Sequence, residues 1–599
     1  MPKNKNIMVK YTSRDFESIK SDLIDHAKRY YPDGYRDFSE ASFGSLMIDL
    51  VSYTGDILSY YLDYHVNESF LDTSLEFDNI RKHARALGYK FAGSPSSFGI
   101  VSLFILCPAN TDGTDPDRDY LPILKAGTTF STVDGGNFSL TEDVDFSNST
   151  VDTVGARIDS TSGQTTYFAV RAYGQVKSGI LQRATVDLTN STFEKFKRVR
   201  VGGTNISEIV SVYDSDGNRY YEVDNLSQEV VFVDTTNKNA QTDGVRSILK
   251  PFATTRRFTV EQDDTGTYLQ FGFGSDGEDD QGLTDPSRVA LKMSGKDHIS
   301  SKSFDPAKLI STNKLGISPY NTELSIIFNS NSPEASNVAA NSLNTVVGSS
   351  FVFQDLNELI ASERDFVVNS LEVSNDNPIT SINVDISVEE LKQRAKSHYA
   401  MQNRAVTKQD YESLVYNMPN KYGAVTRANI VNDPSSSNRK ISLYVISQNN
   451  DGHLAETNMV TKQNIKNWLN QYKSLNDQIE IYDPKIVNIG IEFVVMIDKR
   501  FSQDAVLQEC IDEVKELLAD KLYIGEPLYL TRIYERLNRV DGVVDVRKVM
   551  FDNKSGGNYS SISMDLDKIL SKDGTYLKTP DNVILELKFP DLDIKGTAK

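Results

Sequence analysis

The sequence predicts a multidomain α+β protein, with N-terminal helices, a β-rich middle of antiparallel strands, and small mixed domains towards the C-terminal end. Three patterns predict it. Helical periodicity dominates residues 1–92, alternating strand patterns with turn residues dominate 93–330, and helices and strands alternate from residue 386 onwards. At 599 residues the chain is too long for one hydrophobic core, so several domains are expected.

The chain is organised around one long helix, predicted at residues 42–66, which reads SFGSLMIDLVSYTGDILSYYLDYHV. Two rows of polar residues repeat every seven residues and should form one narrow strip that faces solvent. Their members are Ser45, Ser52, Ser59, Asp49, Asp56 and Asp63. Nearly every other position is apolar, which is typical of a buried helix with more than one neighbour. Gly55 costs roughly 1 kcal/mol relative to alanine and would permit close approach of another helix.

Two further helices are predicted on either side, at about residues 12–31 and 73–88. Thr12 and Asp15 suggest a capping box for the first, and Thr73 and Glu76 suggest one for the second, which Gly88 should end. Three helices shield one another only partly. The rest of the chain or the helices of another subunit must cover the remainder, and the sequence leaves both possibilities open.

The residues predicted to form this helical bundle interface are apolar and come from the first two helices. They are Phe16, Ile19, Leu23, Phe43, Leu46, Met47, Leu50, Ile57, Leu58 and Tyr61.

Composition excludes several classes of protein. The formal net charge of −19 argues against broad affinity for nucleic acid or anionic membrane. No apolar run reaches the length of a transmembrane helix, and the N-terminus has no secretory pattern. Cys107 and Cys510 lie far apart, so neither a disulfide framework nor a metal cluster is expected.

The middle of the chain reads as a series of strands and hairpins. Residues 100–107 predict an apolar strand. A hairpin with a Gly-Gly turn is predicted for TFSTVDGG and NFSLTEDVDF, and another strand is predicted for TYFAVRAYGQV. VSVYDSDGNRYYEVD and RRFTVEQDDTGTYLQFGFG predict two more hairpins. Residues 331–385 read as an irregular linker, and 386–480 and 481–599 as two α+β domains with helices on one face of a sheet.

No catalytic or cofactor site emerges from the sequence. The six histidines form no metal-binding motif, and neither a nucleophile elbow nor a Walker A loop is present. Gly272 begins a GxGxxG match, but the acidic residues that follow it would repel a pyrophosphate. The acidic loops around Asp117 and Asp214 are expected to be solvated turns instead of calcium sites. We therefore expect no enzyme activity, no metal and no cofactor.

Four stretches, in order along the chain, carry a family resemblance. They are YTSRDFESIKSDL with DFSEASFGSLMIDLVSYTGDILSYYLDYHVNESFLDTSLEFDNIRKHARALGY, LPILKAGTTF with GNFSLTEDVDF, RAVTKQDYESLVYNMP, and GEPLYLTRIYERLNRVDGVVDV. The chain resembles the baseplate wedge proteins of T-even-type contractile-tailed bacteriophages, in the baseplate-J-like group. Residues 140–250 and the C-terminal tail match the family only in their general residue pattern.

The resemblance implies a structural subunit of the virion, assembled in the host cytoplasm and located in the tail baseplate. It implies that N-terminal helices join a second wedge subunit, with two copies in each wedge. It also implies that C-terminal domains link neighbouring wedges into a ring around the hub, and that this ring rearranges on tail contraction. Other baseplate and sheath-initiating proteins are further implied partners.

For the C-terminal contact between subunits we expect the helix near residues 530–538 to contribute Leu530, Tyr534 and Val540. Ile533 and Leu537, on the same helix, are more simply the core of their own domain. Two alternatives remain. One is a tail-associated carbohydrate-binding or glycan-degrading protein that uses the β-rich middle, and the other is the equivalent subunit of a non-viral contractile injection system.

Overall fold

The structure, a computed structural model, describes residues 14–31, 42–90, 95–133, 135–148, 151–158, 164–236, 247–263, 265–274, 315–332, 336–354, 359–380, 387–432, 440–449, 451–519 and 521–598. The chain divides into two compact units. The first combines Met1–Phe91 with Ile386–Tyr399, and the second combines Ala92–Asp385 with Ala400–Lys599. The first unit is helical and the second holds every sheet among the described residues.

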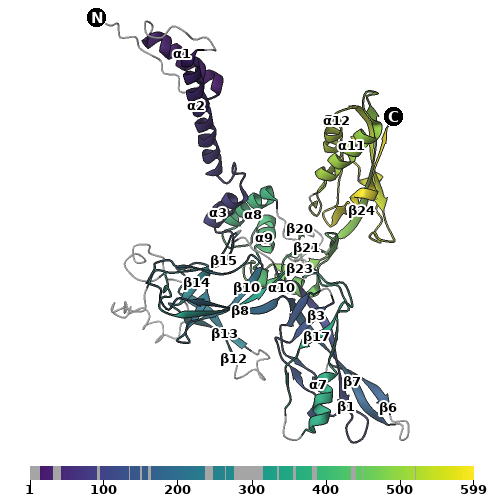
Figure 1. Cartoon of the computed structure of the whole chain (residues 1–599). Coiled ribbons are helices and arrows are strands. Elements are labelled where there is room, and N and C mark those ends of the chain that lie inside the picture. The colour runs from purple at the N-terminus through teal and green to yellow at the C-terminus, as the bar shows by residue number, and fades with distance from the viewer. Residues whose placement is uncertain are drawn as a thin grey trace. The chain divides into compact units, whose positions relative to one another are not determined.

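The helices of the first unit are α1 (Phe16–Tyr30), α2 (Phe43–Glu68), α3 (Phe77–Ala86) and α8 (Val388–Met401) (Figure 1). α1 begins where the Asp15 carboxylate accepts a hydrogen bond from the Ser18 N–H at 3.2 Å. α2 begins where the Ser42 hydroxyl accepts one from the Ser45 N–H at 3.1 Å. The Thr12 of the predicted first capping box lies outside the described residues.

The start of α3 is capped by a carboxylate from the end of α2. Glu68 accepts hydrogen bonds from the Leu75 N–H at 2.8 Å and from the Asn79 side-chain amide at 2.9 Å. The predicted capping box of Thr73 and Glu76 is wrong. The Thr73 hydroxyl donates instead to a backbone carbonyl of α2 at 2.7 Å, and Glu76 makes no side-chain cap. Glu68, eight positions before Glu76, therefore caps α3 in place of the predicted local capping box.

The end of α3 is closed by Gly88, as predicted, in the left-handed conformation with φ of +89°. The Gly88 N–H donates to the Arg85 carbonyl at 2.9 Å, and the Tyr89 N–H donates to the Ala84 carbonyl at 3.0 Å. These are the two hydrogen bonds of a Schellman motif. The reversal returns Tyr89 to the interface between α3 and α8, where it is buried.

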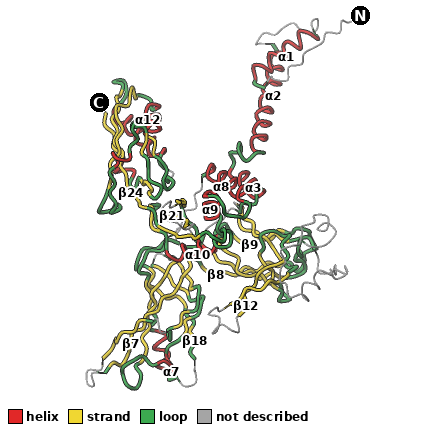
Figure 2. Tube along the Cα trace, turned by 180° about the vertical axis from the view of Figure 1, so that it is seen from behind, coloured by secondary structure: helices red, strands yellow, loops and turns green. Residues whose placement is uncertain are grey.

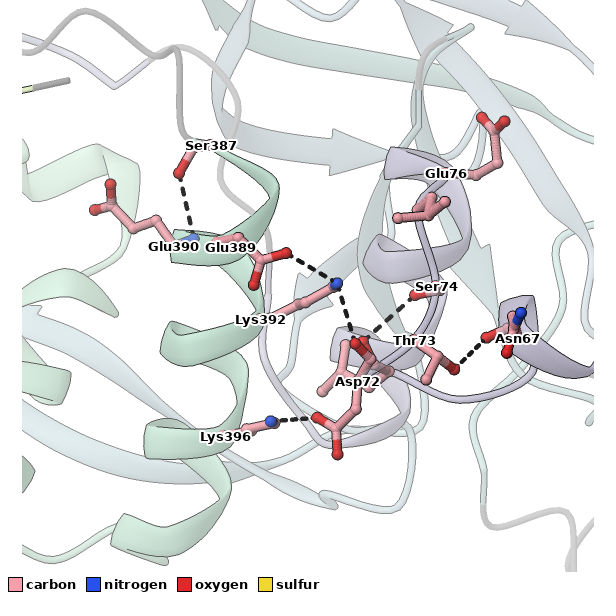
Figure 3. Close-up of polar contacts among 12 residues, drawn as sticks. Asn67, Asp72, Thr73, Ser74, Glu76, Ser387, Glu389, Glu390, Lys392 and Lys396 are labelled. Carbon is pink, nitrogen blue, oxygen red and sulfur yellow. Dashed lines mark hydrogen bonds and ion pairs between the residues drawn. The ribbon is translucent and has the colours of Figure 1, made fainter. Parts of the chain in front are cut away.

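α8 supplies the other half of the core of this unit. The buried apolar residues are Ile80, Ala84, Tyr89, Leu391 and Ala395. Polar contacts surround them (Figure 3). Lys392 Nζ donates to the Asp72 carbonyl at 3.3 Å, and Lys396 forms an ion pair with the Asp72 carboxylate. Lys392 and Asp72 are 320 positions apart, so this core joins distant parts of the chain.

The second unit begins with a seven-stranded sheet, in which five strands come from residues 98–178. The path runs β17-β3-β4-β7-β1-β19, and β6 pairs with β7. The strands are β1 (Phe98–Pro108), β3 (Thr129–Thr132), β4 (Asn137–Leu140), β6 (Asp152–Ile158), β7 (Thr165–Ser178), β17 (Leu343–Gly348) and β19 (Glu372–Ser374). The predicted hairpin with the Gly-Gly turn is confirmed as the antiparallel pair β3–β4.

A smaller sheet in the order β18-β2-β5 and two short helices accompany this sheet. These elements are β2 (Ile123–Leu124), β5 (Val144–Asp145), β18 (Phe351–Val352), the 3-10 helix η1 (Arg118–Tyr120) and α7 (Ala361–Asn369). α7 contributes its fully buried Val367 to the core of the large sheet.

A second seven-stranded sheet has the order β8-β16-β10-β11-β14-β15-β9, and a two-stranded ribbon pairs β12 with β13. The strands are β8 (Ile180–Asp187), β9 (Arg198–Gly202), β10 (Ile206–Tyr213), β11 (Arg219–Glu222), β12 (Val230–Thr236), β13 (Ser247–Ala253), β14 (Arg257–Asp263), β15 (Gly266–Phe271) and β16 (Glu323–Ser330). Both predicted hairpins of this region, β10–β11 and β14–β15, are confirmed. Figure 2 shows these two β regions mainly as strands and loops.

The predicted linker at residues 331–385 differs from the structure. Its described residues supply β17, which pairs with β3, and β19, which pairs with β1. They also supply β18 and α7. These strands are short and their apolar residues few, so their pairing depends on partner strands more than 200 positions earlier, which no local pattern reveals.

The first C-terminal α+β layer pairs β21 with β20, β22 and β23 and packs helices against them. Its elements are α9 (Lys408–Tyr416), the 3-10 helix η3 (Asn420–Tyr422), β20 (Arg427–Asn432), β21 (Lys440–Gln448), β22 (Leu454–Glu456), α10 (Met459–Leu469) and β23 (Gln478–Tyr482).

The second layer is centred on β24, which pairs antiparallel with β26 and parallel with β28 and β29. Its elements are β24 (Lys485–Ile497), α11 (Gln503–Leu517), β25 (Leu528–Tyr529), α12 (Leu530–Arg539), β26 (Val543–Lys554), α13 (Leu566–Ile569), β27 (Tyr576–Leu577), β28 (Val583–Glu586), α14 (Pro590–Asp593) and β29 (Ile594–Ala598). The structure thus confirms the predicted fold class, with N-terminal helices, a β-rich middle and mixed C-terminal elements.

Candidate functional site

α1 and α2 pack side by side in antiparallel orientation, and ion pairs show their register (Figure 1). Arg14 Nη1 lies 2.9 Å from Asp63 Oδ1, and Lys20 Nζ lies 2.8 Å from Asp49 Oδ1. Exposed or partly exposed pairs of this kind each contribute at most about 1 kcal/mol. They set the register of the two helices without holding them firmly together.

The polar strip of α2 faces α1, so the prediction that this strip faces solvent is wrong. Ser45 and Ser52 are buried, and the Ser52 hydroxyl donates to the Ile48 carbonyl one turn earlier at 2.7 Å. Because serine is small and satisfies its hydroxyl within its own helix, this strip allows a close approach of α1. Ser45 and Ser52 of this strip therefore face the neighbouring helix, while Asp63 at its far end stays exposed.

Gly55 continues this close contact, as predicted. A Cβ atom at this position would lie 3.2 Å from Cδ1 of Ile19. Phe16, Ile19 and Leu23 of α1 are half-buried, and α1 has no fully buried residue. The pair of helices consequently has almost no hydrophobic core of its own.

The apolar side chains of α2 point away from α1 into solvent. Exposed fractions are 74% for Phe43, 57% for Leu50 and 67% for Tyr60. The large apolar residues exposed on this helix are Phe43, Leu46, Met47, Leu50, Val51, Tyr53, Leu58, Tyr60, Tyr61, Leu62 and Val66. We call this surface the α2 apolar arc. Ile57, also predicted at the interface, is half-buried.

Exposure on this scale marks an interaction surface. Most of the stability of helices in proteins comes from packing an apolar face against a neighbour. Monomeric proteins rarely expose contiguous apolar patches larger than a few hundred square ångströms. The arc carries no charged side chain between Phe43 and Val66, because Asp49, Asp56 and Asp63 lie towards α1. Such a surface is suited to contact with other apolar helices.

The C-terminal residues predicted to contact another subunit lie mostly within their own domain. Leu530 and Val540 are buried, so a contact through their side chains does not fit the structure. Tyr534 is half-buried, and its hydroxyl accepts a hydrogen bond from the Val549 N–H at 3.0 Å. The helix is amphipathic, and its apolar face covers the sheet centred on β24.

Sequence reasoning missed some residues of the N-terminal surface. Val51, Tyr53, Tyr60 and Leu62 belong to the exposed arc but were outside the predicted interface set. Their apolar character and helical spacing were visible signals. By contrast, no local signal could have shown that α8 completes the core around α3.

The acidic loops adopt turns with internal hydrogen bonds. The Asp117 carboxylate accepts from the Asp119 N–H at 3.2 Å, and Asp214 accepts from the N–H groups of Asp216 and Asn218. Within the described ranges there is no group of three or more His, Cys, Asp or Glu residues placed to hold a metal ion. The last residues of the GxGxxG match lie outside those ranges. None of the described helices is long and apolar enough to span a membrane.

A family model matches the segment that carries this surface. Residues 15–86 match the N-terminal domain of bacteriophage baseplate proteins. This match supports a baseplate protein. No curated protein matches the chain.

Two solved structures resemble the chain at low similarity. One is the 6-fold symmetrised baseplate of the anti-feeding prophage, with 11% identity, 96% of this chain and 98% of that chain covered, and a TM-score of 0.25. The other is the TssK-TssF-TssG baseplate subcomplex of the type VI secretion system, with 8% identity, 74% and 96% covered, and a TM-score of 0.21. Scores this low do not establish a shared fold.

Proposed function

We propose that the chain is a non-enzymatic structural subunit of a phage tail baseplate wedge. Its N-terminal helices join it to a second wedge subunit and to another copy of itself. Its C-terminal domains link neighbouring wedges into a ring around the central hub, and the ring rearranges when the tail contracts. Assembly takes place in the host cytoplasm.

The α2 apolar arc is the observation that carries this proposal. It lies within the residues that match the baseplate N-terminal domain. It is broad, uncharged and exposed, while the helix face that holds small polar residues is already occupied by α1. An enzyme or a ligand-binding module needs no such surface, whereas a subunit that assembles through helices does.

The proposed ring contact needs a different surface from the one first expected. Because Leu530 and Val540 are buried, a neighbouring copy would meet the exposed side of α12, where Arg532, Glu535 and Arg539 lie. A closed ring requires complementary patches on each copy, and charged side chains of both signs can provide them.

The equivalent role in a non-viral contractile injection system is the alternative nearest to this proposal. It assigns the same surfaces the same tasks. The carbohydrate-binding alternative has no observation among the described residues in its favour.

A paired substitution in the arc tests the proposal. Leu50→Asp with Ile57→Asp places one carboxylate at an exposed and one at a half-buried apolar position of α2, so we expect the β and C-terminal regions to fold normally and incorporation into baseplates to fail. The measurement is complementation of particles that lack the chain, with electron microscopy of the tails. Val133→Asp with Leu475→Asp, at two exposed apolar residues of the second unit, is the matched control and should assemble. Complete baseplates containing the arc variant would refute the proposal.

A further inference from the structure

Three polar side chains of the second C-terminal layer meet around one buried carboxylate. Asn488 of β24 and Glu586 of β28 are paired directly across parallel strands, so both side chains lie on the same face of the sheet. They are 1% and 3% exposed. The amine of Lys521, from the segment after α11, lies 3.5 Å from the Glu586 carboxylate, and its side chain is 25% exposed. We call these three residues the Lys-Asn-Glu triad.

The two oxygens of Glu586 face different members of this triad. Oε1 lies 3.5 Å from Lys521 Nζ and accepts a hydrogen bond from the Leu454 N–H at 2.7 Å. Oε2 accepts a hydrogen bond from Asn488 Nδ2 at 2.9 Å. The carboxylate thus lies between an amine and a carboxamide. It is placed to take a proton from the first and to give one to the second.

The oxygen of the Asn488 carboxamide is held by the backbone. Oδ1 accepts a hydrogen bond from the Ser560 N–H at 2.7 Å. Because a backbone N–H can only donate, this contact fixes the carboxamide oxygen on the Ser560 side and its nitrogen on the Glu586 side. The same N–H would stabilise negative charge that develops on Oδ1 when a nucleophile attacks Cγ.

The segment that carries Lys521 is anchored on both of its sides. Arg427 Nη2 of β20, in the first layer, donates to the Lys521 carbonyl at 3.0 Å. The Gly525 N–H donates to the Val583 carbonyl of β28 at 2.8 Å. The backbone of Lys521 is therefore held beside the sheet, and the flexible four-carbon stem of lysine can carry Nζ to Cγ of Asn488.

An apolar cluster lies beside the triad. Its buried members are Ile446, Leu454, Ile524 and Ile584. Ile584 lies two positions before Glu586 on β28 and on the same face, and Leu454 donates its N–H to the carboxylate. An ammonium and a carboxylate lose hydration in such surroundings, which favours proton transfer between them because two neutral groups result. The neutral lysine amine is a nucleophile.

We propose that Lys521 and Asn488 join in an intramolecular isopeptide bond, which the folded chain forms by itself with Glu586 as the catalytic carboxylate. Glu586 takes a proton from the Lys521 ammonium. The neutral Nζ then attacks Cγ of Asn488, and the resulting oxyanion at Oδ1 lies against the Ser560 N–H.

The reaction balances without an oxidant or a reductant. Glu586 passes its proton to Nδ2 of Asn488, which leaves as ammonia with the electron pair of the broken Cγ–Nδ2 bond. The carboxylate then receives the second proton of Lys521 Nζ, and the ammonia carries that proton away as ammonium. One lysine ammonium and one carboxamide thus become one secondary amide and one ammonium ion.

This inference goes beyond the proposed function and does not depend on it. The bond would tie β24 to the segment that Arg427 of the first layer holds. A reaction that occurs once within the chain has no turnover, so it is compatible with a structural subunit. A chain that lacks the bond but enters baseplates would overturn this inference and leave the proposed function standing.

Mass spectrometry of the full chain, denatured after purification, tests the bond. We expect the wild type to weigh about 17 Da less than its sequence, because one ammonia is lost. Trypsin should release one branched peptide that joins the segments around Asn488 and Lys521, because an amide-linked lysine carries no charge for trypsin to recognise. A wild-type chain of full mass, cleaved after Lys521, would overturn the proposal. A mass loss without the branched peptide would overturn it too, because the ammonia would come from another side chain.

Conservative variants separate the chemistry from the fold. Lys521→Arg keeps the positive charge, but its guanidinium stays protonated and cannot attack, so this variant should keep its full mass. Glu586→Gln keeps a hydrogen-bond acceptor but cannot carry the proton, so it should lower the cross-linked fraction more than about tenfold. Lys515→Arg, at a lysine paired with Asp591 in the same layer, is the matched control and should lose ammonia as the wild type does.

Circular dichroism should show all three variants folded like the wild type. A branched peptide at the wild-type level in Glu586→Gln would overturn the catalytic role of Glu586. A mass loss of the same size in Lys521→Arg would overturn the assignment of the nucleophile.

Discussion

Glu68 links two helices through a single carboxylate. It ends α2 and holds the first turn of α3, with the Leu75 N–H and the Asn79 amide as its donors. These hydrogen bonds, the one from Leu75 first, hold the pKa of Glu68 below its usual range. A carboxyl group whose pKa is lower in the folded state stabilises the fold above its unfolded pKa, and this contribution is lost as pH falls through the folded value.

We therefore expect the junction between α2 and α3 to loosen as the pH falls below the ordinary glutamate pKa of about 4.3 and through the lower pKa of the folded state. The measurement is the pH dependence of thermal unfolding of the first unit in the wild type and in Glu68→Gln. The wild type should lose stability more steeply than the variant below that pH, because glutamine does not titrate. Parallel curves would show that the carboxylate charge is unimportant.

At the scale of elements, the contact between α1 and α2 depends on small side chains. At Gly55, alanine would gain roughly 1 kcal/mol of helix propensity. Its Cβ would need only a small shift of Ile19, from which it would lie 3.2 Å away. We expect Gly55→Ala to be tolerated and Gly55→Leu to separate the helices.

Amide hydrogen exchange in α1 measures this separation. Gly55→Leu should abolish protection of α1 amides, whereas Thr54→Leu, which adds a large side chain on the exposed side one position earlier, should leave it unchanged. Retained protection in Gly55→Leu would mean that the helices need no close approach.

The strip on α2 also shows how much the sequence could predict. Periodicity located the helix within two residues at either end and identified its polar strip, but it predicted the wrong neighbour for that strip. Polar residues usually mark the side that faces water. Here serine and glycine matter for their size, and the apolar majority is exposed. The apolar majority of the helix, and not its polar strip, is thus the feature on which the proposed assembly rests.

Similar reasoning explains which features of the second unit could be predicted from the sequence and which could not. Hairpins such as β3–β4 were predictable because strand alternation and turn glycines are local. The pairings of β17 and β19 depend on strands far earlier in the sequence and were missed. Burial of Val540 likewise depends on the sheet that α12 covers, which spacing alone does not specify.

At the scale of the whole molecule, the two C-terminal layers are joined by a buried carboxylate. Glu586 is 3% exposed. It accepts hydrogen bonds from the Leu454 N–H at 2.7 Å and from the Asn488 amide at 2.9 Å, and it lies 3.5 Å from Lys521 Nζ. β22 of one layer and β24 of the next therefore share one acceptor, which β28 carries.

Glu586→Ala should uncouple them. It leaves the buried Leu454 N–H and Asn488 amide without a partner, at about 1–3 kcal/mol each. We expect calorimetry to show a lower transition temperature for the C-terminal region, while the helices around α3 unfold as in the wild type. Glu586→Gln keeps a hydrogen-bond acceptor, so it should lower this transition temperature less than Glu586→Ala does. An unchanged transition in Glu586→Ala would show that the layers are joined by other contacts.

The core shared by α3 and α8 also has a consequence for synthesis of the chain. A ribosome adds roughly 5–20 residues per second, so the 320 positions between Asp72 and Lys392 take about 15–60 seconds to make. During that interval Ile80 and Ala84 have no α8 to cover them. The core around α3 is therefore completed only after the β-rich middle has been synthesised.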